Sequence, residues 1–326
     1  MVVAFGEQTS HYFNRLHIGV PEAIPLGPAA WRPADMADTR HWMVHLTDDH
    51  VAELESAFFE AVNSGIAMAD LVASQFPLPS LAGELATWRR EVTDGRGFLV
   101  VRGFPVESWG VEQTEYIYWG LGLHLGQPGA QNPEGDLLGH VVDHGDAGDL
   151  DAVRVYRTSN VIRFHCDGAD MVGLLCLTKS ASGGRSQIVS SVSVFAELLA
   201  SRPDLAARLC ESFALDLRND ADEVKHLPVR PVCHDGRRVR TFFDSDCFRS
   251  AERHESVELG RLDIAALDAW EDIAMRPSMC LEMDLEPGDL QLLSNHTIAH
   301  ARTAYEDVPD LPKRHLLRLW LTISTH

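Results

Sequence analysis

The sequence predicts a β-rich fold with added α-helices, in which a helical N-terminal part packs on a sandwich or barrel of short strands. Helical spacing of apolar residues dominates before residue 97, and short strand-like runs with turn clusters between them dominate from about Leu137. No linker-like segment divides the 326 residues, and 45% of them are hydrophobic, which is enough for a large core. We therefore expect a single domain over residues 1–326.

Residues 1–96 form the expected irregular and helical N-terminal part. The first 40 residues are rich in Pro, Gly and Ala and read as an irregular lead-in. Thr47–Asp49 then precedes apolar residues at helical spacing and predicts a capped helix. Further along, the pattern predicts helices at Leu81–Val92 and Val111–Leu125, with a buried strand at Gly97–Gly103 between them.

Residues 97–326 form the expected strand-rich core, with a helical insertion over about residues 203–277. The predicted strands are Val153–Tyr156, Val172–Leu177, Gln187–Val189, Val239–Phe243, Met279–Leu285, Asp289–Leu293 and Leu316–Ser324. The predicted helices within this part are Val192–Leu199, Pro203–Ser212 and Ile264–Met275. Many short strands with turns between them favour a sandwich or barrel.

Charge and cysteine usage limit the function classes. The net charge is −20, with a pI of about 5.1, so the surface repels phosphate backbones and anionic lipids and argues against nucleic-acid or membrane partners. Six scattered cysteines form no framework, which is typical of a reducing compartment. With no signal peptide or membrane-length apolar run in sight, we expect a cytoplasmic protein.

Two His-x-Asp pairs are candidate metal ligands, since residues two apart on an extended segment point to one face. His144 and Asp146 lie in a polar, glycine-bearing stretch that reads as a solvated loop. His165 and Asp167 lie between strand-like runs, at the edge of the expected core. The second pair is therefore the better candidate.

A third ligand must come from elsewhere, and the C-terminal third offers His296 and His300. Two histidines and one carboxylate on one face of a metal are the arrangement of non-haem iron(II) oxygenases. Zinc with three protein ligands and a water is not excluded by this pattern.

Arg314 and Arg318 add an anion site to this picture. On a strand, positions 314, 316 and 318 share one face, and the apolar neighbours indicate that the segment is buried. Two buried guanidinium groups require an anion, and a dicarboxylate fits their planar donors. The alternative is a solvated basic edge of the last strand.

Several motifs together, in order over roughly residues 97–324, resemble the taurine dioxygenase and clavaminate synthase-like family of iron(II)/2-oxoglutarate-dependent oxygenases. The pieces are Phe164–Gly168, Gly183–Ser186, Val194–Leu199, Pro287–Leu290, Asn295, His300–Tyr305 and Arg314–Leu321. Each piece is modest, and the ordered set carries the resemblance.

The resemblance implies a double-stranded β-helix, or jelly roll, with iron(II) at one mouth held by His165, Asp167 and His300. It implies that Arg314 binds the distal carboxylate of 2-oxoglutarate and that Ser186 assists it, while Arg318 resembles a position that supports either cosubstrate or substrate. The implied reaction uses molecular oxygen and 2-oxoglutarate, releases succinate and carbon dioxide, and oxidises a small molecule, with hydroxylation as the expected outcome.

Substrate contacts are less well marked. Gln131, Asn132 and Arg318 are candidates, and the two amides could equally satisfy partners in the core. Arg163 is either a substrate contact or an outward charge. Arg318 favours an amino acid or another small carboxylate as substrate. The rival interpretations are a zinc hydrolase or isomerase on the same barrel and a non-catalytic binding protein.

Overall fold

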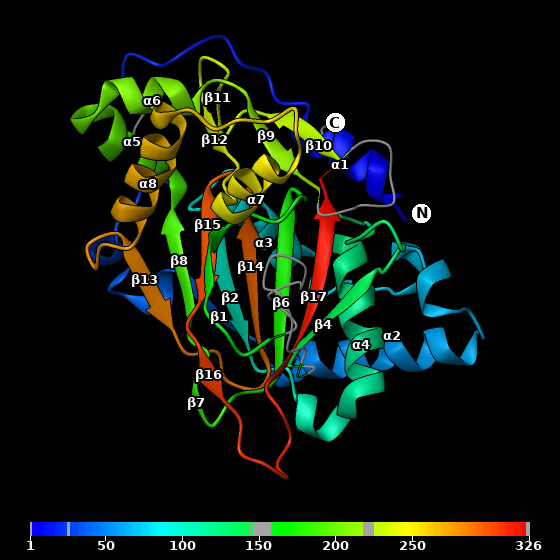
Figure 1. Cartoon of the computed structure of the whole chain (residues 1–326). Helices are drawn as coiled ribbons and strands as arrows, with labels where there is room; N and C mark the ends of the chain where they lie inside the picture. The colour runs from blue at the N-terminus through cyan, green and yellow to red at the C-terminus, as the bar shows by residue number, and fades with distance from the viewer. Residues whose placement is uncertain (1, 25–26, 144, 146–157, 218–224, 324–326) are drawn as a thin grey trace.

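Two sheets form the centre of the molecule (Figure 1). The computed structural model describes the chain except residues 1, 25–26, 144, 146–157, 218–224 and 324–326. The larger sheet contains β1 (Met43–His45), β2 (Phe98–Arg102), β14 (Asp289–Ser294), β6 (Met171–Thr178), β17 (His315–Thr322) and β3 (Gln127–Pro128) in this order, with β4 (Leu138–Val142) also paired to β17. The smaller sheet has the order β13 (Cys280–Met283), β8 (Ser186–Ser190), β15 (Ile298–Arg302) and β5 (Ile162–His165).

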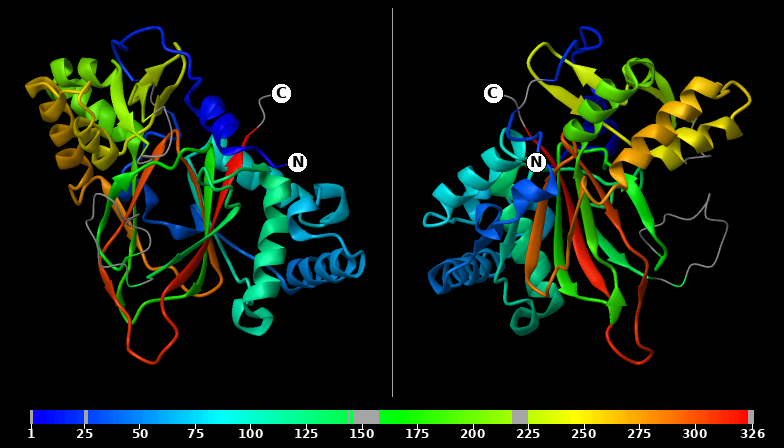
Figure 2. Two further views of the ribbon diagram at one scale, coloured as in Figure 1. Left: turned by 45° about the vertical axis from the view of Figure 1, so that its right-hand side comes forward. Right: turned by 90° about the vertical axis from the view of Figure 1, so that its left-hand side faces the viewer.

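Helices cover the outer face of each sheet (Figure 2). The N-terminal helices α2 (Asp48–Asn63), α3 (Ala82–Thr93) and α4 (Val106–Leu125) share a hydrophobic cluster with the larger sheet. The helices α5 (Ser191–Ser201), α6 (Pro203–Leu209) and α8 (Arg261–Ala274) share another with the smaller sheet. A third cluster contains residues of both sheets and lies between them. The arrangement is therefore helix, sheet, sheet, helix.

Strand alternation assigns each side chain of β17 to one of these layers. Leu317, Leu319 and Leu321 belong to the cluster under the N-terminal helices, whereas Leu316 and Trp320 belong to the cluster between the sheets. Successive side chains of a strand point to opposite faces, so Arg314 and Arg318 fall on the side of Leu316 and Trp320. Arg314 and Arg318 therefore point into the space between the two sheets.

Most elements lie where the sequence predicts them. Thr47 accepts a hydrogen bond from His50 N and caps α2, as its position indicated. Each predicted strand among the described residues overlaps an observed one, and the predicted helices at 81–92, 192–199, 203–212 and 264–275 overlap α3, α5, α6 and α8. The predicted strand Val153–Tyr156 lies outside the described residues.

Two predictions were wrong in part. The lead-in contains helix α1 (Phe5–Phe13), which is held by tertiary contact, since Tyr12 is buried and its hydroxyl donates to Asn295 O at 2.7 Å. The helix predicted at Val111–Leu125 is confirmed, since Gly110 at φ 72° separates it from a short helical segment that starts at Val106, and the two segments together form α4.

The insertion is also less helical than expected. It contains two hairpins, formed by β9 (Phe213–Asp216) with β10 (His226–Val229) and by β11 (Val232–His234) with β12 (Val239–Thr241). A short helix, α7 (Ser245–Ser250), follows them. β12 lies within the predicted strand Val239–Phe243, whereas β9, β10 and β11 are three or four residues long and were not recognised from their periodicity. A last pair, β7 (Ser182–Gly183) with β16 (Tyr305–Glu306), extends the other end of the molecule. Among the described residues, every helix is too short or too polar to cross a lipid bilayer.

Trp270 of α8 packs against Phe243 within the insertion. Its ring stacks on Phe243 with 3.8 Å between ring centroids, and it is 1% exposed. We expect Trp270→Ala to lower the free energy of unfolding by about 3–5 kcal/mol, because a buried aromatic side chain leaves a cavity. Leu262→Ala, on the exposed side of α8, is the control and should change it by less than about 0.5 kcal/mol. Denaturant unfolding measures both, and equal effects would contradict the packing.

Candidate functional site

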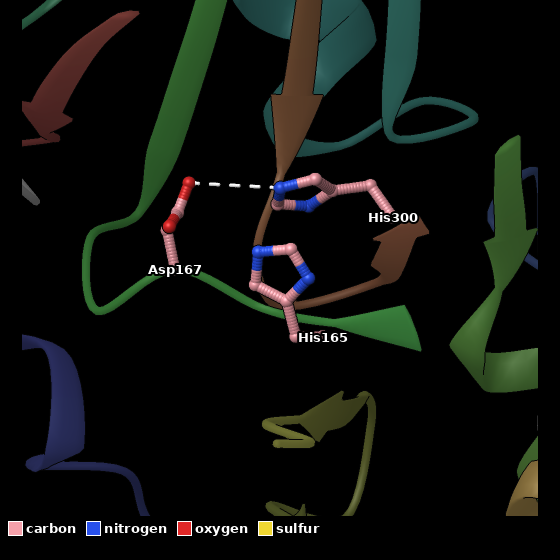
Figure 3. A group of neighbouring side chains, drawn as sticks. All are labelled: His165, Asp167 and His300. Carbon is pink, nitrogen blue, oxygen red and sulfur yellow. Dashed lines mark ion pairs between the residues drawn. The ribbon is translucent and has the colours of Figure 1, made fainter. Parts of the chain in front are cut away.

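Three side chains from two neighbouring strands converge between the sheets (Figure 3). His165 ends β5, Asp167 follows in the β5–β6 loop, and His300 lies in β15. The antiparallel pairing of β15 with β5 sets His300 directly opposite His165. Their potential ligand atoms and an oxygen of Asp167 all lie within 4.8 Å of one another. Strand register thus brings together residues that are far apart in sequence.

The charges of this cluster suit metal binding. Burial, and then the neighbouring His165, lower the pKa of His300 to about 3, so its imidazole is neutral. Burial alone would raise the pKa of Asp167, but the positive charge of Arg318 and, after it, the interactions with the two histidines outweigh this effect and leave that pKa below its usual value. A neutral imidazole and an ionised carboxylate are the forms that bind a metal.

Hydrogen bonding orients the rings. His165 Nδ1 lies 3.0 Å from the carbonyl oxygen of Arg163, a contact that places the proton on Nδ1 and leaves the Nε2 lone pair free. His300 Nε2 lies 3.7 Å from Asp167 Oδ2. Asp167 Oδ2 is buried and accepts no hydrogen bond from the described residues. A buried carboxylate oxygen facing two imidazoles fits a cation at this point.

Asn295 holds the loop that carries Asp167. Its Oδ1 accepts a hydrogen bond from Asp167 N at 3.0 Å, and its Nδ2 donates to Ala169 O at 2.8 Å. Tyr12 of α1 in turn donates to the backbone oxygen of Asn295. Asn295 was recognised in the sequence only as part of a motif, and the contribution of Tyr12 was missed because it depends on tertiary packing.

Arg318 joins the carboxylate of Asp167 to Gln131, which follows β3. Its Nη1 lies 3.3 Å from Asp167 Oδ1, and its Nε donates to Gln131 Oε1 at 2.7 Å. Gln131 Nε2 donates back to Arg318 O at 2.8 Å, so the amide holds both the side chain and the backbone of this arginine. Asn132 instead bonds with Asp136 in its own loop.

A cavity between the sheets adjoins the cluster. Its walls include His165 and His300 together with Ser186, Arg302, Arg314, Leu316 and Arg318. Positions 314, 316 and 318 therefore do share one face, as the strand pattern predicted. The solvated-edge alternative is wrong, because Arg314 and Arg318 are only 5% and 9% exposed.

Arg314 is a buried cation in need of an anion. Among the described residues no carboxylate pairs with its guanidinium, its Nη1 has no hydrogen-bond partner, and its Nη2 reaches only Gly184 O at 3.4 Å. Burial lowers its pKa. Burial and then the charge of Arg314 lower the pKa of the nearby Arg302 to about 10. Arg302, a motif residue to which the sequence assigned no role, therefore adds to the positive charge.

Gly184 makes room for this arginine. It has a φ of +70°, and a Cβ there would lie 2.9 Å from Arg314 Nε. Only glycine meets both conditions without strain. Ser186 follows on β8, and its hydroxyl donates to Gln291 Oε1 at 3.0 Å while lining the same cavity.

The remaining candidates lie elsewhere. Arg163 is directed toward the insertion, where it lies 3.9 Å from Asp246 and 3.7 Å from Glu271. His296, the alternative third ligand, pairs with Asp170 at 2.7 Å and is not in the cluster. Of the other His-x-Asp pair, His144 and Asp146 lie outside the described residues.

The sequence is similar to known proteins over most of its length. Residues 64–320 match the family described as "Taurine catabolism dioxygenase TauD, TfdA family". FR-33289 synthase from Streptomyces rubellomurinus (strain ATCC 31215) is 30% identical over 306 residues, which cover 91% of this chain and 90% of that protein. Taurine hydroxylase-like protein SAT17 from Stachybotrys chartarum (strain CBS 109288 / IBT 7711) is 26% identical over 311 residues, which cover 89% and 77%.

Solved structures share the fold. An asparagine oxygenase in complex with Fe(II), 2S,3S-3-hydroxyasparagine and succinate aligns with a TM-score of 0.69 and 19% identity, over 86% of this chain and 93% of that one. The non-heme iron oxygenase OrfP, in complex with Fe and alpha-ketoglutaric acid, aligns with a TM-score of 0.62 and 16% identity, over 86% and 94%.

Asn295 provides a test of how the cluster is held. We expect Asn295→Leu to weaken the binding of a divalent transition metal by about 10–100-fold, because the backbone of Asp167 loses its acceptor. Asn63→Leu, on the exposed end of α2, is the control and should leave the affinity unchanged. Metal titration of both variants measures the effect, and an unchanged affinity in a folded Asn295 variant would show that the loop is held otherwise.

Proposed function

The chain belongs to the taurine catabolism dioxygenase TauD, TfdA family, the iron(II)/2-oxoglutarate oxygenases that its motifs resemble, and on this premise we propose which residues do the work. His165, Asp167 and His300 bind iron(II) on one face. Arg314, assisted by Ser186, binds the distal carboxylate of 2-oxoglutarate. The substrate is a small molecule, and hydroxylation is the expected outcome.

The observation that carries this proposal is the buried Arg314, whose guanidinium pairs with no carboxylate of the described residues, in the cavity that His165 and His300 also line. A dicarboxylate that chelates the metal at one end would place its other carboxylate against a cation further along the cavity. A planar guanidinium offers paired donors to a carboxylate. Zinc chemistry gives this arginine no role.

Bound iron(II) supplies the oxidative decarboxylation of 2-oxoglutarate by molecular oxygen, giving succinate and carbon dioxide, coupled to oxidation of the substrate. The protein contributes positions and charges. Arg318 holds Asp167 by Oδ1, which leaves Oδ2 for the metal. Leu174 and Leu316 keep the cavity wall apolar, so that its few charges act in a medium poor in water.

We propose an amino acid or another small carboxylate as the substrate. Arg318 supports this, since its guanidinium lines the cavity beside the metal ligands. The structures of the asparagine oxygenase and OrfP also support an amino acid as substrate, because their complexes contain 2S,3S-3-hydroxyasparagine and L-Arg. Gln131 acts on this site through its hydrogen bonds to Arg318. Asn132 and Arg163 are proposed only as substrate contacts further from the metal ligands.

The architecture completes the proposal. The two sheets with their covering helices form the double-stranded β-helix, within a single domain that carries the insertion at about residues 203–277. A backbone hydrogen bond supports a single domain, since Cys166 N, beside the metal ligands, donates to Phe243 O of the insertion at 2.7 Å. All six cysteines are free thiols, which supports a cytoplasmic location.

Arg314 tests the cosubstrate site. We expect Arg314→Ala to raise the Kd for 2-oxoglutarate by roughly 10- to 150-fold, since it removes charged hydrogen bonds worth about 1.5–3 kcal/mol. Anaerobic calorimetry on the iron(II)-loaded protein measures the Kd. Arg276→Ala, an exposed arginine outside the cavity, should bind like wild type. If both variants bind alike, the cosubstrate lies elsewhere.

Gln131 and Asn132 form a matched pair. We expect Gln131→Leu to weaken iron(II) binding by about tenfold, because Arg318 and through it Asp167 lose their orientation. Asn132→Leu should not, since its partner Asp136 lies outside the site. Anaerobic titration with iron(II) measures the affinity of each variant. Equal affinities would remove Gln131 from the positioning role.

A further inference from the structure

A second, larger cavity lies at the end of the sheets where α1, the end of α3 and the β11–β12 hairpin meet. Its volume is about 710 Å³, and Ser294 at the end of β14 and Ile323 just after β17 form part of its wall. Both views in Figure 2 show α1 and the hairpin at this same end. None of its described lining residues lines the cavity beside the metal cluster. It is therefore a separate site.

This cavity is basic, although the chain carries a net charge of −20. Six arginines line it against two carboxylates, those of Asp94 and Asp170. The arginines are Arg15, Arg89, Arg90, Arg237, Arg238 and Arg240. They come from three separate parts of the chain, so no single basic run explains them. An acidic protein that gathers arginines around one hollow has a field there that attracts anions.

The two carboxylates are already engaged. Asp94 pairs with Arg238 at 2.8 Å, a bond that joins the end of α3 to the β11–β12 turn. Asp170 accepts from His296 Nε2 at 2.7 Å and lies 2.9 Å from His11 Nε2. Ile323 N also donates to it. Among the described residues that line the cavity, arginines therefore outnumber carboxylates, and both carboxylates already have partners.

Arg15 supplies an independent sign of a missing partner. It is 9% exposed, and its Nη2 donates to Arg230 O at 2.8 Å. Its Nε and Nη1 have no hydrogen-bond partner among the described residues. Its guanidinium lies 5.5 Å from the Tyr12 ring, which accounts for its orientation but supplies no negative charge. A buried cation with idle donors fits an anionic ligand.

We propose that this cavity binds a small molecule that carries a phosphate group. A phosphate monoester carries a charge of about −1.5 to −2 near neutral pH and three strong acceptor oxygens, which matches several converging guanidinium groups. Arginine suits this contact because its planar donors bind phosphate in pairs. The volume lies within the range of roughly 300–1,000 Å³ typical of small-molecule sites.

The test is calorimetric titration of the full chain, purified without added metal, with pyrophosphate at low salt. Binding that weakens as sodium chloride is raised is expected. Arg237→Gln combined with Arg240→Gln should weaken it by about tenfold or more. Both side chains are at least partly exposed, so the fold should persist, and the unfolding transition checks this. Arg261→Gln combined with Arg276→Gln, two exposed arginines outside the cavity, is the control and should bind like wild type.

Two further titrations separate this site from the cosubstrate site. Arg314→Ala should bind pyrophosphate as wild type does, and citrate should bind more weakly than pyrophosphate. The proposal is overturned if wild type does not bind, if the Arg237/Arg240 variant binds equally well, or if Arg314→Ala abolishes binding. Tighter binding of citrate would overturn the assignment to phosphate. Because no readout involves iron or turnover, these results are independent of the oxygenase proposal.

Discussion

The pairing of β15 with β5 is the constraint on which the candidate site depends. It sets His300 opposite His165, and strand alternation points His300 and Arg302 between the sheets while Ala299 and Ala301 pack under the helices. A slip of one residue in this register would turn His300 toward the helical layer. The helices that cover both sheets fix the register, because each strand has a face that must remain buried. The same strand pairing therefore packs the core and brings the site residues together.

Charge balance is the second constraint. Asp167 is buried beside Arg318, whose positive charge compensates that of the carboxylate. Arg314 and Arg302 lie further along the cavity, and no carboxylate of the described residues lines its wall there. The cavity is therefore positive at the end remote from Asp167. A metal ion beside Asp167 and a carboxylate beside Arg314 would balance these charges. The proposed iron and 2-oxoglutarate therefore fit the same cavity.

Much of this could be predicted because it depends on local pattern. His165 and Asp167 lie two residues apart at a strand end, and Arg314, Leu316 and Arg318 alternate on the last strand. The side-chain period of a strand is enough to group each set. The choice of His300 over His296 needed the motif resemblance; in the structure His300 lies in the cluster and His296 pairs with Asp170.

The rest depends on contacts between distant parts of the chain. Helix α1 was missed because Tyr12 is anchored by Asn295, 283 residues away. The bond of Gln131 to Arg318 and the proximity of Arg302 to Arg314 likewise arise only when the strands pair. The hairpin strands β9, β10 and β11 of the insertion carry too few residues for their period to be read. Local propensity cannot report such contacts, because tertiary packing decides them.

The most direct measurement of the central claim is succinate formation by the iron(II)-reconstituted protein given oxygen and 2-oxoglutarate. The account predicts slow turnover without substrate in wild type, loss of it in His165→Ala and in His300→Ala, and retention of it in His296→Ala after folding is checked. Equal succinate formation by wild type and both ligand variants would contradict the account. So would an absence of turnover in wild type together with a failure of 2-oxoglutarate to bind the iron-loaded protein.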